Sequence, residues 1–270
     1  MLVLEEFDGR ILLAGDWHGS FSQADKVIRS AKEQGIKYIL QLGDFGIWDN
    51  DKPFLNQMQH LLEEWDIHLY FIDGNHENFP RLYEKKINED GTRYVRDNIT
   101  YIPRGYRWQW EEVTFLALGG AASIDKPFRR EGRSWWSEEY LTEEDILTAQ
   151  SGGPVDVMFC HDSPAGAPNS VTDDNMGQVR AMKTFGADMI NYCNNHRQLL
   201  KRVTDVTTPR MLFHGHYHQF MNGYYVHGDE KSTVAYVEGL DEGIAPLHKH
   251  TRLLTLDSIR GAISALDNME

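Results

Sequence analysis

Short apolar runs alternate with amphipathic segments in the N-terminal part of the chain. The runs at residues 11–14, 38–42 and 68–72 have the length and composition of buried strands. Between them, residues 21–34 and 52–65 carry apolar side chains at the spacing of a helix that buries one face. This strand–helix alternation predicts an α/β fold built around a layered sheet.

The remainder of the chain changes character. Residues 120–150 are polar and aromatic, and we expect a long functional loop that leads into a helix near residues 142–150. The composition of residues 162–180 is typical of a loop, whereas residues 189–201 have a helical pattern. No stretch resembles an interdomain linker, so we expect one domain over residues 1–270. Further short strands are expected at residues 99–102, 106–109, 113–118, 155–160, 211–213, 223–227, 232–238 and 252–257.

The composition is that of an ordinary globular protein, with 41% hydrophobic and 25% charged residues among 270. A chain of this length can bury a substantial core. Its formal net charge of −14 disfavours general binding to nucleic acid backbones and to anionic membranes. If the protein handles phosphate, bound cations must therefore reverse the field locally.

The two cysteines, Cys160 and Cys193, have no spacing partners for a zinc knuckle or a redox pair, and a disulfide framework is not indicated. Residues 1–14 are interrupted by charges and lack the pattern of a signal peptide. No apolar run approaches the ~18 residues of a membrane span. We therefore expect a cytoplasmic protein without a membrane partner.

Metal-ligating residue types follow several of the predicted strands. Asp16, Asp44 and Asn75 each stand just beyond one of the first three strands, at intervals of roughly 30 residues, which is the length of a βαβ unit. The carboxyl ends of parallel strands meet at one edge of a sheet, so these side chains are expected to converge there. Carboxylate, amide and imidazole groups are the ligands that hard and borderline divalent cations take. The pieces that carry them are Gly15-Asp16-Trp17-His18, Gly43-Asp44, Gly74-Asn75-His76-Glu77, Cys160-His161-Asp162, His214 and Gly215-His216-Tyr217-His218.

Taken in order, the motifs D-x-H, G-D, G-N-H-E, a lone histidine after a strand and G-H-x-H resemble the calcineurin-like metallophosphoesterase family, over about residues 12–218. The resemblance implies an αββα sandwich of four layers, in which two mixed β-sheets are flanked by helices. It also implies a two-metal site, where a hydroxide that bridges the ions attacks the phosphorus of a phosphate ester. The implied ligands are Asp16, His18 and His218 for one ion, Asn75, His161 and His216 for the other, and Asp44 as the bridge between both.

The resemblance also assigns a catalytic part to His76, as the general acid or electrostatic stabiliser of the departing oxygen. His214 lies two residues before His216, so on a continuous strand it would share that face and could support the site. The same alternation would turn Tyr217 away from the metals.

Three arginines in the 120–150 loop are candidate substrate-binding residues. Arg129, Arg130 and Arg133 precede a tryptophan pair, Trp135-Trp136. Their guanidinium groups could grip a phosphate oxygen, and the tryptophans could stack a base or a sugar. The alternative is a solvated basic turn beside a core tryptophan pair.

The substrate prediction rests on the residues directly after the motifs. Protein phosphatases of this family usually continue G-D with a further aspartate and arginine, but here Gly43-Asp44 is followed by Phe45-Gly46-Ile47-Trp48. The chain thus more closely resembles the bacterial and phage-type phosphoesterases of the family, many of which cleave phosphodiesters, including cyclic nucleotides. This resemblance implies a phosphodiesterase that acts on a small phosphorylated substrate, with a nucleotide or cyclic nucleotide as the preferred class. The alternatives are a phosphomonoesterase or protein phosphatase that uses the same site, and a non-catalytic metal-binding scaffold. The mixed ligands suit manganese, which we prefer, and also iron, zinc, cobalt or nickel; the oligomeric state stays open.

Overall fold

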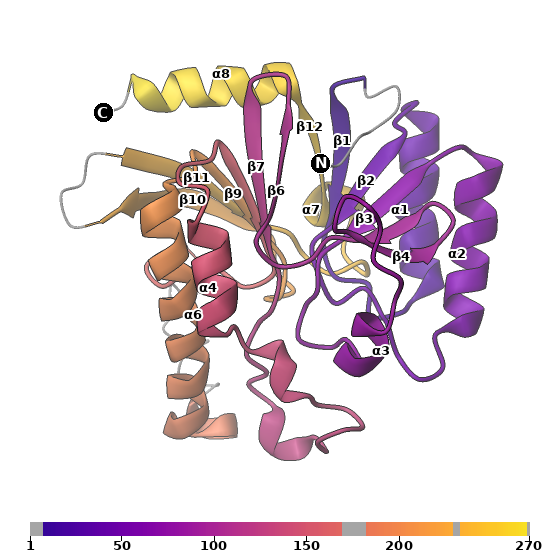
Figure 1. The fold of residues 1–270 in the computed structure, drawn as a ribbon, viewed down its shortest axis with the longest axis horizontal. Coiled ribbons are helices and arrows are strands. Elements are labelled where there is room, and N and C mark those ends of the chain that lie inside the picture. Colours follow the sequence, from indigo (N-terminus) through magenta and orange to yellow (C-terminus); the bar gives the residue numbers. More distant parts are fainter. Residues whose placement is uncertain (1–7, 169–181, 229–232, 269–270) are drawn as a thin grey trace.

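A computed structural model describes residues 8–168, 182–228 and 233–268. Within these ranges, two mixed six-stranded sheets lie face to face and helices cover their outer faces, as Figure 1 shows. The αββα sandwich that the resemblance implied is therefore confirmed. The part of the predicted loop 162–180 from residue 169 onward lies outside the described residues.

The first sheet contains the N-terminal strand–helix units. In spatial order its strands are β12 (Thr251–Thr255), β1 (Arg10–Ala14), β2 (Tyr38–Gln41), β3 (His68–Phe71), β5 (Ile99–Tyr101) and β4 (Arg93–Arg96). Strands β1, β2, β3 and β5 are parallel, so the loops after β1, β2 and β3 leave from the same edge. Helices α1 (Phe21–Glu33) and α2 (Lys52–Glu64) pack on the outer face, where their apolar sides form one core cluster with the sheet.

The second sheet is formed by the C-terminal half. Its strands, in spatial order, are β10 (Met221–His227), β11 (Thr233–Gly239), β9 (Met211–His214), β8 (Val157–Cys160), β7 (Val113–Leu118) and β6 (Tyr106–Trp110). Helices α4 (Glu143–Gln150) and α6 (Ala187–Thr207) cover its outer face and form a separate core cluster with it. The short helices α3 (Phe79–Tyr83) and α7 (Leu247–His250) lie in connecting segments.

Side-chain alternation along the strands explains how the layers of the sandwich pack together. On β1, Leu12 contributes to the cluster beneath α1 and α2, whereas Leu13 contributes to the cluster between the sheets. That central cluster is rich in aromatic rings, and Trp108 stacks on Phe115 with ring centroids 5.2 Å apart. The packing fixes the two sheets against each other and so holds their loop-bearing edges in place.

The C-terminus departs from the prediction. The strand expected at residues 252–257 ends earlier, because β12 gives way at once to helix α8 (Leu256–Asp267). Thr255 and Ser258 form a reciprocal capping box at this junction, and this box starts a helix that the sequence pattern did not lead us to expect. Both cysteines are free thiols. No helix in the described ranges combines the length and hydropathy that a membrane span requires.

Candidate active site

The loops after β1 and β2 are joined through their backbones. The backbone nitrogen of His18 donates to the carbonyl oxygen of Asp44 at 2.7 Å. Gly15 is needed at the start of the first loop, because a Cβ there would lie 2.1 Å from the carbonyl oxygen of Asp241. These contacts bring the side chains of Asp16, His18 and Asp44 to the same edge of the sheet.

Four side chains form a first cluster at this edge. Their ligand atoms lie within 4.8 Å of one another, and the residues are Asp16, His18, Asp44 and His218. The Nε2 atoms of His18 and His218 are 3.0 Å apart. His218 Nε2 is also 3.1 Å from Asp16 Oδ2, a buried oxygen that accepts no hydrogen bond of good geometry. Imidazole nitrogens and carboxylate oxygens that face one another in this way fit a shared cation.

A second cluster lies beside Asp44. His161 Nε2 is 3.2 Å from Asn75 Oδ1 and 3.5 Å from Asp44 Oδ2. The rings of His161 and His216 have their centroids 5.1 Å apart. His161 Nδ1 donates to the carbonyl oxygen of Leu42 at 2.7 Å, which leaves Nε2 as the ring nitrogen that faces this cluster.

Electrostatics in the clusters also favour a cation. Burial alone would raise the pKa of Asp44, but the surrounding histidines hold it well below its usual range. Burial would lower the pKa of His161, but Asp44 and Asp16 outweigh this effect and raise the pKa to about 10. Burial lowers the pKa of His216 to about 4, so that ring is a neutral donor at ordinary pH. The buried carboxylates therefore create a field that attracts positive charge.

Backbone strain is concentrated at the same residues. Among the described residues, eight that are not glycine have positive φ, and half of these belong to the two clusters: His18, Asp44, His216 and His218. Such conformations cost ~1–3 kcal/mol each and persist where the surrounding structure enforces them. Strain of this kind is typical of sites in which side chains are aimed for function.

The last of these segments departs from the predicted geometry. Strand β9 ends at His214, and His216 and His218 then adopt φ values of 71° and 49°. The segment after His214 is therefore not a strand, so side-chain alternation gives no support for the inferences that His214 shares a face with His216 and that Tyr217 turns away from the metals. Tyr217 instead donates its hydroxyl to Asp162 Oδ1 at 2.6 Å.

A buried chain of hydrogen bonds fixes the amide of Asn75. Asn75 Nδ2 donates to Ser123 Oγ at 2.9 Å, and that hydroxyl donates to Glu139 Oε2 at 2.6 Å. Glu139 also accepts from the Ser123 backbone at 2.8 Å and from the Tyr192 hydroxyl at 3.2 Å. Because the Ser123 proton is committed to Glu139, Ser123 can only accept from Asn75, which turns Asn75 Oδ1 toward His161. Neither Ser123 nor Glu139 was predicted, since neither lies in a motif.

Two buried acids hold the G-N-H-E loop in place. Asp73 accepts hydrogen bonds from Arg104 Nε at 2.8 Å and Nη2 at 2.6 Å. Glu77 accepts from the backbone nitrogens of Gly74 at 2.7 Å and Gly46 at 3.2 Å, and so ties this loop to the one after β2. Burial raises the pKa of Glu77 to about 8. The geometry of Asn75 and His76 therefore depends on residues that do not face the clusters.

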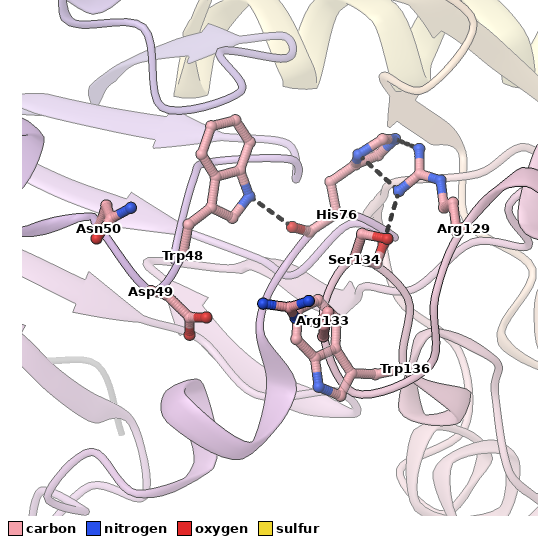
Figure 2. A pocket seen from close by; sticks show the side chains of 8 residues that line it. All are labelled: Trp48, Asp49, Asn50, His76, Arg129, Arg133, Ser134 and Trp136. Carbon is pink, nitrogen blue, oxygen red and sulfur yellow. Dashed lines mark hydrogen bonds between the residues drawn. The ribbon is translucent and has the colours of Figure 1, made fainter.

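A cleft of about 360 Å³ opens beside His76, and Figure 2 shows its lining. Arg129 Nη1 and Nη2 lie 3.0 and 2.7 Å from the two ring nitrogens of His76, and Arg129 Nε donates to Asp125 at 2.7 Å. Burial and, to a smaller degree, Arg129 lower the pKa of His76. Of the other predicted arginines, Arg133 lines the cleft, whereas Arg130 does not and is exposed.

Comparisons with known proteins agree with this geometry. The family model described as calcineurin-like phosphoesterase matches residues 9–220. A solved dimetal phosphatase from Danio rerio is 16% identical with a TM-score of 0.53, and the match covers 92% of this chain and 93% of that one. The Thermus thermophilus protein TT1561 is 10% identical with a TM-score of 0.51, over 91% of this chain and 98% of that one. At these identities the two structures demonstrate a shared fold. A search of curated proteins finds no match.

Proposed function

Because the chain belongs to the calcineurin-like phosphoesterase family and is a metal-dependent phosphoester hydrolase, we propose that it is a phosphodiesterase of nucleotides or cyclic nucleotides. In this proposal one domain, residues 1–270, carries the whole site, and the enzyme acts on a small substrate in the cytoplasm. The observation that carries the proposal is the convergence of carboxylate, amide and imidazole donors on two adjacent clusters that share Asp44.

The donor sets fit two divalent cations. Asp16, His18 and His218 would hold the first, and Asn75, His161 and His216 would hold the second. Asp44 would bridge them, since its Oδ2 lies 3.7 Å from His18 Nδ1 and 3.5 Å from His161 Nε2. When bound, the cations would activate a water molecule and withdraw charge from the phosphoryl oxygens. We prefer manganese, for which mixed nitrogen and oxygen ligands are suitable.

We propose that His76 acts on the oxygen that departs. Its backbone nitrogen donates to Asp44 Oδ1 at 2.8 Å, and its Nε2 lies 3.9 Å from Asp44 Oδ2, so the ring borders the first cluster. We assign it a hydrogen bond or a proton to the leaving oxygen. Arg129 lies against the ring and would bind a free oxygen of the same phosphate.

The cleft supports a diester over a monoester. A diester carries an organic group on each side of phosphorus, and the group on the His76 side needs room beside that ring. The cleft supplies about 360 Å³ there, which is within the usual size of small-molecule pockets. A monoester of a protein side chain would need a more open surface and would leave this space unfilled.

Removal of metal tests the proposal directly. The protein is stripped with a chelator, reloaded with Mn²⁺, and assayed on bis(p-nitrophenyl) phosphate and on p-nitrophenyl phosphate. We expect hydrolysis to vanish on stripping, to return on reloading, and to favour the diester. Hydrolysis that persists without metal would refute the mechanism, and a strong monoester preference would refute the substrate class.

A variant separates an enzyme from a non-catalytic scaffold. Asp44→Asn should unseat both cations and abolish turnover, because the Asp44 side chain borders both clusters. If the wild type binds two metals per chain but hydrolyses neither ester, the scaffold interpretation prevails.

A further inference from the structure

The cleft beside His76 has two walls from distant parts of the chain. Trp48 stands on one wall, in the segment after the G-D motif, and Trp136 stands on the other, in the loop between β7 and α4 (Figure 2). His76 and Arg129 also line the cleft, and His76 Nε2 lies 3.9 Å from Asp44 Oδ2 of the candidate metal-ligand clusters. Any group in this cleft is therefore adjacent to the residue assigned to the departing oxygen.

Trp48 is an exposed aromatic ring whose orientation is fixed. Its side chain is 39% exposed, yet its Nε1 donates to the carbonyl oxygen of His76 at 2.7 Å. Gly19 packs against the ring, since a Cβ there would lie 3.2 Å from Trp48 Cζ3. An indole held this firmly at the surface is prepared to stack a planar group with little loss of conformational freedom.

The charges of the cleft favour an anion. Arg129 contacts Asp125 and His76 and is already assigned to the phosphate that is cleaved, whereas the Arg133 side chain makes no hydrogen bond or ion pair within the described ranges. Asp49 also lines the cleft and is negatively charged, and its Oδ1 accepts from Asn78 Nδ2 at 2.7 Å, but the lining carries two guanidinium groups against this one carboxylate. Although the chain has a net charge of −14, the guanidinium of Arg133 can therefore attract an anion into the cleft.

We propose that this cleft is the subsite for the departing arm of the diester, and that it selects an arm with a planar ring and a second anionic group. Trp48 and Trp136 receive the ring, and Arg133 binds the second anion. The inference rests on the proposed function and narrows its substrate class to diesters in which the leaving alcohol is itself a nucleotide.

The chemistry of this step is ordinary hydrolysis. A bond forms from the water oxygen to phosphorus, and the bond from phosphorus to the arm oxygen breaks with its electron pair on that oxygen. The arm leaves as an alcohol after it takes a proton, and the second proton of the water is released to solvent. The departing nucleotide keeps its own phosphate, which Arg133 holds.

Binding of three probes tests the subsite independently of turnover. Ribose 5-phosphate has no ring, adenosine 5′-monophosphate adds the base, and adenosine 3′,5′-bisphosphate adds a second phosphate. Affinities are measured by calorimetry at one fixed free Mn²⁺ concentration. In the wild type we expect the base to improve affinity about 5- to 100-fold and the second phosphate to improve it about tenfold.

The variants separate the two contributions. Trp48→Leu should remove the gain from the base, and Trp48→Phe, which keeps a ring, should retain most of it. Arg133→Gln should remove the gain from the second phosphate alone. Arg130→Gln is the matched control, because Arg130 is exposed in the same loop but lies outside the cleft, and it should preserve both gains.

The outcomes are distinguishable from those of the proposed function. Equal affinities for ribose 5-phosphate and adenosine 5′-monophosphate in the wild type would overturn the subsite, as would gains that survive both Trp48→Leu and Arg133→Gln. If the gains behave as expected but the metal-loaded protein hydrolyses no ester, the subsite stands and the proposed reaction fails.

Discussion

Ser123 offers a way to weaken one metal position and spare the other. Its hydroxyl links Asn75 Nδ2, at 2.9 Å, to Glu139 Oε2, at 2.6 Å, and all three side chains are buried. Ser123→Ala removes both contacts and leaves a buried amide donor without a partner, which costs ~1–3 kcal/mol. The amide can recover a partner only by turning its oxygen away from His161, and in that orientation Asn75 is no longer a ligand.

The loss should therefore appear as metal affinity at a single position. Removal of a group that orients a ligand typically lowers metal affinity ~10–100-fold, which corresponds to a loss of about 1.4–2.8 kcal/mol in binding free energy. This range agrees with the cost of the unpaired Asn75 amide donor. The second position, with Asn75, His161 and His216, should weaken by this amount. The first position, with Asp16 and His18, should bind as in the wild type.

A competition titration with a chromophoric chelator resolves the two positions. Metal-stripped wild type, Ser123→Ala and Glu139→Gln are each titrated with Mn²⁺. Glu139→Gln should lower the affinity of the same position, because the NH₂ group of glutamine cannot accept the hydrogen bonds that Ser123 donates to Glu139. Ser137→Ala is the control, since the Ser137 hydroxyl is exposed and donates to neighbouring Glu138. Unchanged affinity at both positions, or equal weakening of both, would refute the reasoning.

Three further predictions concern His76 and the buried acids. His76→Ala should lower turnover ~10²–10⁴-fold while both metals are retained, and loss of metal in the same variant would contradict a role confined to the leaving oxygen. Asp73→Ala should lower the free energy of unfolding by up to ~3–5 kcal/mol in a denaturant titration, because it removes the closest carboxylate from Arg104, whose side chain is 5% exposed and keeps only the longer 3.3 Å ion pair with Asp145; a change below about 1 kcal/mol would show that the pair is not structurally important. Burial alone would raise the pKa of Asp162, but the hydrogen bond from His196 and nearby positive charge lower it below its usual 3.8. The ionised carboxylate of Asp162 therefore stabilises the folded protein above pH 3.8, and this stabilisation is lost as pH falls below that value. From about pH 6 to about pH 3, the free energy of unfolding of the metal-stripped wild type should fall by more than that of Asp162→Asn. Parallel pH profiles of the two proteins would contradict this prediction.

The first three strands of the first sheet and the two helices between them could be predicted because their signals are local. The helix expected at residues 52–65 is α2, Lys52–Glu64, and the helix expected at residues 21–34 is α1, Phe21–Glu33. In both, apolar side chains at helical spacing bury one face against the sheet. Helix α8 was missed although its capping box is visible in the sequence, because the apolar positions within residues 252–257 also fit a strand.

The convergence of the candidate ligands could be predicted because these residues lie in contiguous motifs at strand ends. The residues that support them could not. Ser123 and Glu139 meet Asn75 only through the packing of the 120–150 loop against the G-N-H-E loop, a contact between distant segments that no short pattern encodes. In the sequence, Trp48 drew notice only as part of a segment that differs from the corresponding segment of protein phosphatases. Its position in the cleft depends on a hydrogen bond to the His76 backbone, which the sequence does not reveal. Periodicity likewise failed after His214, where strained φ values replace strand geometry.

The central claim is that one carboxylate, Asp44, joins two cation positions. Anomalous diffraction from crystals of the Mn²⁺-loaded protein, recorded at the manganese edge, tests it most directly. We predict two peaks that flank Asp44, one among Asp16, His18 and His218 and the other among Asn75, His161 and His216. A single peak, or peaks that do not share Asp44, would contradict the account.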